Sequence, residues 1–159
     1  MKFSLASIAA FVSAVTAASL PPAFTLVAEG GSTVLTDGQY LYVNGNTTSQ
    51  EIAIFRSNGD TGMVTFTSKD STPTGFQNVF VVENTVLPVE LTRPHSGAVP
   101  EGASMSDFGM TDDGYFTHAD KDWFAVDGYG SNPQKTIYWY GAHSSTYRAM
   151  PLWVKEFKE

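Results

Sequence analysis

The chain has 159 residues, with 16 acidic against 9 basic side chains and no cysteine. The absence of cysteine excludes disulfides, thiolate catalysis and cysteine-ligated metal centres, and the net charge of −7 disfavours nucleic acid and anionic membranes as partners. At this length about two thirds of the unfolded surface can be buried, so one domain can be stable without covalent cross-links.

The first 18 residues have the organisation of a cleavable export signal. One basic residue is followed by an apolar run over residues 3–15 and then by small residues. The alternative is a membrane anchor, but the run is shorter than the ~20 apolar residues that a spanning helix needs, and two prolines follow it. We therefore expect cleavage after Ala17 or Ala18 and secretion of one domain, residues 19–159.

The rest of the chain has the pattern of short β-strands. No segment longer than a turn repeats apolar residues every 3.6 positions, whereas β-branched and aromatic runs recur between glycine and asparagine. This predicts an all-β domain of about ten short, mainly antiparallel strands, arranged as a small β-barrel or a compact β-sandwich. In chain order, the expected strands are Phe24–Ala28, Gln39–Val43, Glu51–Arg56, Met63–Thr67, Asn78–Glu83, Leu87–Leu91, Tyr115–His118, Trp123–Val126, Thr136–Tyr140 and Leu152–Phe157.

Turn signals separate many of these strands. Alternation within them predicts Val64 and Phe66 inside, and likewise Leu87, Val89 and Leu91. Pro88, which cannot donate to a ladder, indicates an edge strand. Residues 97–105 are expected to form the longest loop. Five residue pairs that tolerate the positive φ of tight turns favour a meander of hairpins. They are Asp37-Gly38, Asn44-Gly45, Asn58-Gly59, Asp113-Gly114 and Asp127-Gly128.

The serines and histidines form no recognised catalytic or metal-binding pattern. There is no G-x-S-x-G, and His95, His118 and His143 lack H-E-x-x-H or H-x-H spacing. We expect each lone histidine to be a surface or turn residue. The sequence predicts no catalytic residue, no metal site and no cofactor.

Acidic residues are concentrated between positions 101 and 127. Two carboxylates about 5 to 9 Å apart could hydrolyse a glycosidic bond, and clustered carboxylates could hold Ca²⁺, although the spacing of a calcium loop is missing. The simplest interpretation is turn carboxylates that keep the protein soluble. The candidates for a catalytic pair are Asp107, Asp112, Asp113, Asp120 and Asp122.

Aromatic residues are frequent in the C-terminal half, where Tyr138, Trp139 and Tyr140 are consecutive. On a strand, Tyr138 and Tyr140 share one face, opposite Trp139. One face is expected in the core. The other, if exposed, would form a platform that stacks on sugar rings or anchors a protein partner.

One surface modification is also predicted. Asn46-Thr47-Thr48 is an N-glycosylation sequon. It is consistent with a secretory route and places Asn46 in a surface loop.

Four segments resemble a known group of proteins: AFTLVA (Ala23–Ala28), LYVNGNTTS (Leu41–Ser49), PHSGAVPEGASMSDFG (Pro94–Gly109) and PLWV (Pro151–Val154). Here the chain is similar to the small secreted fungal proteins related to the phialide-development cell-wall protein PhiA, and to the fungal elicitors called hypersensitive-response-inducing proteins. The resemblance implies a compact, β-rich, non-enzymatic protein of the fungal cell wall, or released from it, whose plant-associated relatives provoke defence responses. It carries over no catalytic residue.

This chain departs from that group in its cysteines. Relatives often place one soon after the TTS segment and another near the C-terminus, whereas Gln50 follows Ser49 here and no cysteine is present. The stapling disulfide is therefore absent. Stability must come from the core, in which we expect Phe66, Val81, Trp123 and Trp153.

The resemblance is strongest around His95 and Ser96, which makes this loop a candidate binding site. The alternative is a turn shaped by its glycines and Pro100, in which the His95 ring or the Ser96 hydroxyl satisfies loop backbone groups. The two interpretations stay open at this point.

Together these features predict a secreted, non-catalytic fungal cell-wall-associated or effector-like protein. It would bind a cell-wall polysaccharide or a host protein through the Tyr138–Tyr140 segment or the His95-Ser96 loop. The alternatives are a small glycan-active hydrolase that uses two acids of the 107–127 segment, and a purely structural wall protein.

Overall fold

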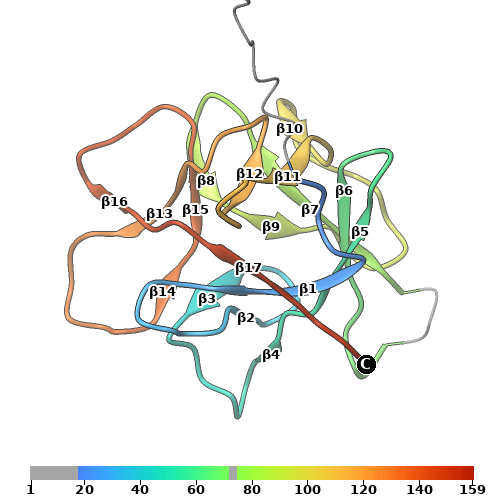
Figure 1. Ribbon diagram of the computed structural model, residues 1–159. Helices are drawn as coiled ribbons and strands as arrows, with labels where there is room; N and C mark the ends of the chain where they lie inside the picture. Colours follow the sequence, from blue (N-terminus) through green and yellow to red (C-terminus); the bar gives the residue numbers. More distant parts are fainter. Residues whose placement is uncertain (1–17, 72–74) are drawn as a thin grey trace, which may run out of the picture.

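The structure is a computed structural model that describes residues 18–71 and 75–159. The expected export signal falls almost entirely on residues 1–17, which lie outside the described residues. The described residues form 17 short strands and no helix (Figure 1), so the all-β prediction is confirmed. Accordingly, they contain no helix long and apolar enough to cross a bilayer.

Seven strands form the largest sheet. Its order is β10-β7-β6-β5-β1-β17, with β9 also paired to β7. Figure 1 shows β1 and β17 side by side across the molecule, in agreement with their antiparallel register. The strands are β1 (Ala23–Val27), β5 (Phe55–Asn58), β6 (Met63–Phe66), β7 (Gln77–Val82), β9 (Glu90–Leu91), β10 (Ala103–Ser104) and β17 (Trp153–Glu156).

Two four-stranded sheets and one hairpin complete the fold. The first sheet has the order β16 (Tyr147–Ala149), β13 (Phe124–Asp127), β15 (Tyr138–Tyr140), β8 (Val86–Pro88). The second has the order β14 (Lys135–Thr136), β3 (Leu41–Val43), β2 (Leu35–Thr36), β4 (Glu51–Ile52). The hairpin consists of β11 (Phe108–Met110) and β12 (Phe116–His118).

The sheets surround a shared core and do not close into a barrel among the described strands. The centre is a series of rings in which Phe108 stacks on Phe116 at 5.4 Å and Phe116 stacks on Phe124 at 5.3 Å, measured between ring centroids. Trp139 meets Phe124 edge-on at 5.2 Å. Because no disulfide is present, this packing is the main source of cohesion.

Two expected core residues differ from the prediction. Phe66 and Val81 are buried as predicted. Trp123 is half-buried and packs against the edge of the core. The prediction for Trp153 is wrong, because its side chain is 52% exposed. Leu152 and Val154 take the inward positions of that strand, and alternation turns Trp153 outward.

Three of the expected strands are each divided between sheets. At each break a residue outside both strands donates its backbone N–H to a neighbouring segment: Ala53 to Val34, Val89 to Ile137, and Ile137 to Leu41. The two halves of each run pair with strands of different sheets, so each run becomes two short strands. Four further strands of two or three residues, β2, β10, β11 and β16, were not expected, and β10 lies inside the predicted 97–105 loop.

Turn chemistry and edges follow the prediction more closely. The Asp37-Gly38, Asn58-Gly59 and Asp113-Gly114 pairs lie in connections between paired antiparallel strands. The other two pairs open longer loops. Pro88 lies on β8, an edge strand of its sheet, as predicted. Val89 and Leu91 are buried as predicted, but the prediction for Leu87 is wrong, because its side chain on this edge strand is 42% exposed.

Candidate functional site

The alternation predicted for the consecutive aromatic residues is confirmed. Trp139 is 3% exposed and belongs to the core, whereas Tyr138 and Tyr140 are half-buried on the opposite face of β15. The cause is the two-residue period of a strand that covers the core with one face. Trp139 is therefore unavailable to a partner, and only the two tyrosines of this segment face outward.

The outer side of β13, β15 and β16 carries what we call the aromatic face: Trp123, Tyr138, Tyr140 and Tyr147. The rings of Tyr138 and Tyr147 lie 4.7 Å apart between centroids, and those of Tyr140 and Tyr147 lie 6.3 Å apart. Beneath them Ala125, opposite Tyr138 in the register, is fully buried. The small side chain of Ala125 leaves room for the tyrosine rings to close over β13.

One end of the aromatic face is already occupied by the protein itself. Lys121 Nζ lies 4.4 Å from the centroid of the Trp123 ring, and the His143 ring lies 4.5 Å from it on the loop after β15. The Tyr140 hydroxyl donates a hydrogen bond to the Ser144 carbonyl. The rings left open to a ligand are therefore those at the Tyr138 end.

Beside Tyr138 lies a recess of about 420 Å³, which we call the Tyr138 recess. Tyr129, 67% exposed, stands on its rim, and the polar side chains of Asp127, Asn132 and Gln134 line it. A pocket that combines apolar rings with a few convergent polar groups is the usual form of a small-ligand site.

The loop that forms the recess is held by its own side chains. Asp127 Oδ1 accepts a hydrogen bond of 2.8 Å from the Tyr129 N–H, and Asn132 Oδ1 accepts one of 3.0 Å from the Gln134 N–H. Lys135 Nζ donates to the Tyr129 carbonyl at 2.7 Å. These bonds order the loop without a ligand, which lowers the entropic cost of binding.

The surroundings of the Tyr138 hydroxyl raise its pKa. Burial is the main cause, and the neighbouring Tyr147 hydroxyl, to which it is hydrogen-bonded, raises the pKa further, followed by the charges of Asp127 and Tyr40. The recess presents this phenol beside the side chains of Asp127, Asn132, Gln134 and Lys135.

Of the residues that line the recess, the sequence pattern indicated only Tyr138 as a binding residue. It did not indicate a binding role for Asp127, Tyr129, Asn132 and Gln134. The available signal was the segment DGYGSNPQ, residues 127–134, a polar glycine-containing loop with one aromatic residue. Such a composition indicates a loop, but it does not say that the loop folds back beside β15.

His95 and Ser96 lie in the loop after β9 and are exposed. Ser96 Oγ accepts a hydrogen bond of 3.3 Å from the Ala98 N–H, and the Ser96 N–H donates to the Arg93 carbonyl at 3.0 Å. Ser96 thus satisfies loop backbone groups, as the turn interpretation predicts. Neither residue lines the Tyr138 recess.

Of the five candidate carboxylates, the structure brings Asp107 and Asp120 to one place. The Ala119 N–H donates to the Asp107 carbonyl at 2.9 Å, and both carboxylates line an open recess of about 590 Å³ together with Asp60. Asp112 and Asp113 lie in the turn at the other end of the β11–β12 hairpin. All of these side chains are exposed.

A calcium site finds no support in this region. Across residues 18–71 and 75–159, no group of three or more histidine, cysteine, aspartate or glutamate side chains is placed to hold a metal ion. Asp122 is exposed and is absent from the recess that Asp107 and Asp120 share. The clustering of acidic residues in the sequence therefore does not become a clustering of ligands in space.

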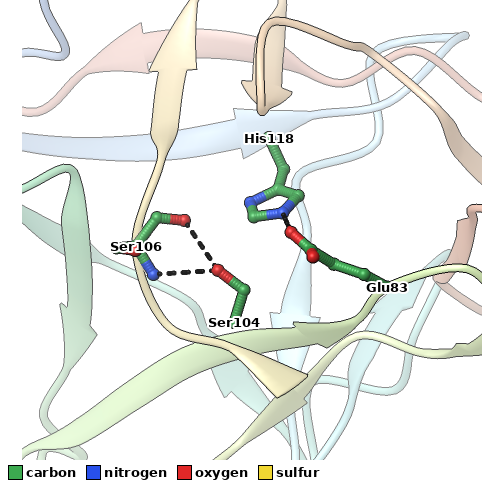
Figure 2. A network of polar contacts seen from close by, with 4 residues as sticks. All are labelled: Glu83, Ser104, Ser106 and His118. Carbon is green, nitrogen blue, oxygen red and sulfur yellow. Dashed lines mark hydrogen bonds and ion pairs between the residues drawn. The ribbon is translucent and has the colours of Figure 1, made fainter. Parts of the chain in front are cut away.

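His118 contradicts the expectation that the lone histidines are surface or turn residues. It is fully buried, and its Nε2 lies 2.8 Å from Glu83 Oε1, as Figure 2 shows. Its ring also contacts Phe108 and Trp139, each at 5.1 Å between centroids. Nearby, the Ser104 hydroxyl donates to the Ser106 carbonyl and accepts from the Ser106 N–H (Figure 2). The bond between His118 and Glu83 ties β12 to the residue after β7.

Asn46 is exposed, in agreement with the predicted surface loop. Its Oδ1 accepts a hydrogen bond of 2.9 Å from the Thr48 N–H, and its carbonyl accepts from the Ser49 and Gln50 N–H groups. Glycosylation of Asn46 stays a prediction.

Comparisons of the chain with protein-family models, with curated proteins and with solved structures find no match. The resemblance to fungal cell-wall and elicitor proteins stays a prediction for that reason.

Proposed function

We propose that this chain is a secreted, non-catalytic protein that binds a neutral cell-wall polysaccharide at the Tyr138 recess. The observation that carries the proposal is the concave surface on which the Tyr138 and Tyr129 rings stand beside Asp127, Asn132 and Gln134. The surface is preorganised by hydrogen bonds within its own loop.

The chemistry of this surface fits a sugar ring. A pyranose has an apolar C–H face, which packs on an aromatic ring, and a rim of hydroxyl groups, which bond to carboxylates and amides. Tyr129 and Tyr138 supply the rings, and the polar side chains of the loop supply the hydrogen-bonding groups. A recess of about 420 Å³ is within the usual size range of ligand sites.

The charge of the protein favours a neutral glycan over an acidic one. With 16 acidic against 9 basic residues, the chain repels polyanions at long range. Neutral β-glucan and chitin carry no such penalty. The signal-like N-terminus, the sequon at Asn46 and the resemblance to fungal wall proteins support the same setting.

The proposal is tested by retention on insoluble β-1,3-glucan and on chitin. We expect the wild type to be retained, and Tyr129→Ala or Tyr138→Ala to bind roughly tenfold more weakly, a change of about 1.4 kcal/mol. Phe76→Ala is the matched control, because Phe76 is 52% exposed and lies outside the recess. Circular dichroism checks that each variant folds.

Two results would overturn the proposal. One is wild-type protein that is retained on neither glycan; capture of a host protein by that same surface would then favour the elicitor alternative. The other is retention that both tyrosine variants leave unchanged. Loss of retention in Phe76→Ala as well would point to a general loss of structure.

A second function has one specific observation in its favour, the shared recess of Asp107 and Asp120. Glycoside hydrolysis needs one carboxyl to stay protonated, which proteins achieve by burial, whereas both side chains are exposed here. We expect no release of reducing sugar from either glycan. Release that Asp107→Asn and Asp120→Asn abolish would establish the hydrolase instead.

A further inference from the structure

Trp153 is one of five large apolar side chains that the described residues leave exposed, and alternation along β17 turns it outward. Its flanking residues Leu152 and Val154 are buried, whereas 52% of Trp153 is exposed on the edge strand β17. The Tyr115 ring lies 5.4 Å from it between centroids, at an angle of 57°. Trp153 and Tyr115 together therefore present an aromatic surface to solvent.

The two rings form one wall of a groove of about 520 Å³, which we call the Trp153 groove. The turn Glu29-Gly30-Gly31 and Pro151 also line it. Gly30 and Gly31 have φ of +85° and +87°, and no atom lies within 4 Å of the position that a Cβ would occupy. Bare backbone therefore faces open space in this turn.

The polar group of the groove is the exposed Glu29 carboxylate. Arg148 Nη1 donates to Glu29 Oε2 at 3.2 Å in a solvent-exposed ion pair. The turn itself is closed by hydrogen bonds between Gly31 and Ala28 and between Ala28 and Ser32. The groove thus combines an indole, a phenol ring and a carboxylate.

The Trp153 groove is separate from the Tyr138 recess. Tyr147 and Arg148 are neighbours on β16, so their side chains point to opposite sides of that strand. Tyr147 belongs to the aromatic face, and Arg148 reaches Glu29 of the groove. The two surfaces therefore lie on opposite sides of β16, and one glycan segment cannot stack on both rings at once.

We propose that the Trp153 groove is a second binding site for a neutral glycan, so that one protein molecule holds two glycan chains. Trp153 stacks on the C–H face of a sugar unit, Tyr115 bounds it, and Glu29 accepts a hydroxyl hydrogen bond. The choice of a neutral glycan as the ligand rests on the proposed function. The location of the site rests on the geometry of the Trp153 groove alone. A groove that places an indole and a phenol ring beside a carboxylate suits a sugar, whose C–H face packs on the rings and whose hydroxyl groups bond to the carboxylate.

The groove is tested by nuclear magnetic resonance of the ¹⁵N-labelled protein. The chain has three tryptophans, and the indole signal that disappears in Trp153→Phe is the one from Trp153. We expect laminarihexaose or chitohexaose to shift that signal, and to shift it equally in Tyr129→Ala. We expect Trp153→Ala to weaken binding at the groove at least tenfold, and Phe76→Ala to leave it unchanged.

Bivalency has its own readout. We expect the wild type to cross-link a long soluble β-1,3-glucan into a turbid suspension, and Trp153→Ala and Tyr129→Ala each to bind the glucan without turbidity. The inference is overturned if neither hexasaccharide shifts the Trp153 indole signal. It is overturned equally if a protein partner shifts that signal and the hexasaccharides do not. The two proposals can fail separately. If the hexasaccharide shifts the Trp153 signal but Tyr129→Ala is retained on glycan as well as the wild type, the groove is supported as a glycan site and the Tyr138 recess is rejected as one.

Discussion

His118 Nε2 lies 2.8 Å from Glu83 Oε1, although the two residues are 35 positions apart in the chain. The imidazole is fully buried, whereas the Glu83 side chain is 45% exposed. His118 Nδ1 has no hydrogen-bond partner among the described residues. The bond to Glu83 is therefore what compensates the burial of this ring at the junction of β12 and β7.

Removal of the Glu83 carboxylate should destabilise the fold. We expect Glu83→Ala to lower the free energy of unfolding by about 1–3 kcal/mol, because His118 then has both ring nitrogens buried without a partner. Glu83→Gln should lose less, since its amide oxygen can still accept the hydrogen bond. Urea unfolding measures the difference, with exposed Glu156→Ala as the control. Equal stability of Glu83→Ala and that control would contradict the role of the pair.

Gly62 should tolerate no side chain. Its φ is +66°, and a Cβ there would lie 2.9 Å from the backbone nitrogen of Asp107, which cannot rotate away. We expect Gly62→Ala to cost about 1–3 kcal/mol through strain and overpacking. Gly59→Ala, in the same connection, has no atom within 4 Å of the new Cβ and should be near neutral. Similar unfolding midpoints for the two variants would show that the contact between residues 62 and 107 relaxes freely.

Tyr42 should titrate later than an ordinary tyrosine. Burial raises its pKa to about 12, helped by the hydrogen bond and charge of Asp37, whose Oδ2 lies 2.8 Å from the hydroxyl. Because the ordinary pKa is 10.0, the stabilisation from the protonated phenol is fully present below pH 10 and is lost as pH rises through about 12. Asp37→Asn should lower the pKa of Tyr42 but not restore it fully, since burial remains.

Ring resonances of ¹³C-labelled tyrosine report that titration residue by residue, with Asp60→Asn as a control that lies away from Tyr42. The ultraviolet absorbance of tyrosinate gives an independent curve for all seven tyrosines together. A Tyr42 titration that Asp37→Asn leaves unmoved would assign the whole shift to burial.

The Phe116 ring should be among the costliest to remove. It is 1% exposed and stacks between Phe108 and Phe124 at the centre of the core. We expect Phe116→Ala to lower the free energy of unfolding by about 3–5 kcal/mol, since no disulfide limits the loss. Phe116→Leu should lose less, and exposed Phe76→Ala very little. Thermal unfolding that ranks the three variants otherwise would contradict this account of the core.

Much of the fold could be predicted from local signals. The apolar period of two placed Val64 and Phe66 inside, and it separated Trp139 from its tyrosine neighbours. Pairs such as Asp37-Gly38 marked hairpin connections because their backbone conformation depends on residue type alone. Strands of two residues were missed, because a pattern of that length carries no periodicity.

The candidate site could be predicted only in part. Tyr138 was found, but its partners Tyr129 and Gln134 come from a loop whose return to β15 is not written in any local pattern. The pairing of His118 with Glu83 and the two-acid recess of Asp107 and Asp120 likewise join distant positions.

By itself, the amino-acid sequence determined that this chain is all-β, that it has no disulfide, and which side chains share a face of each strand. Only the tertiary structure decided the burial of individual side chains that the local pattern does not settle. It buried His118 and exposed Trp153, against expectation in both cases. The physical reason is that strand conformation follows from neighbouring residues, whereas burial is set by contacts among segments far apart in the chain.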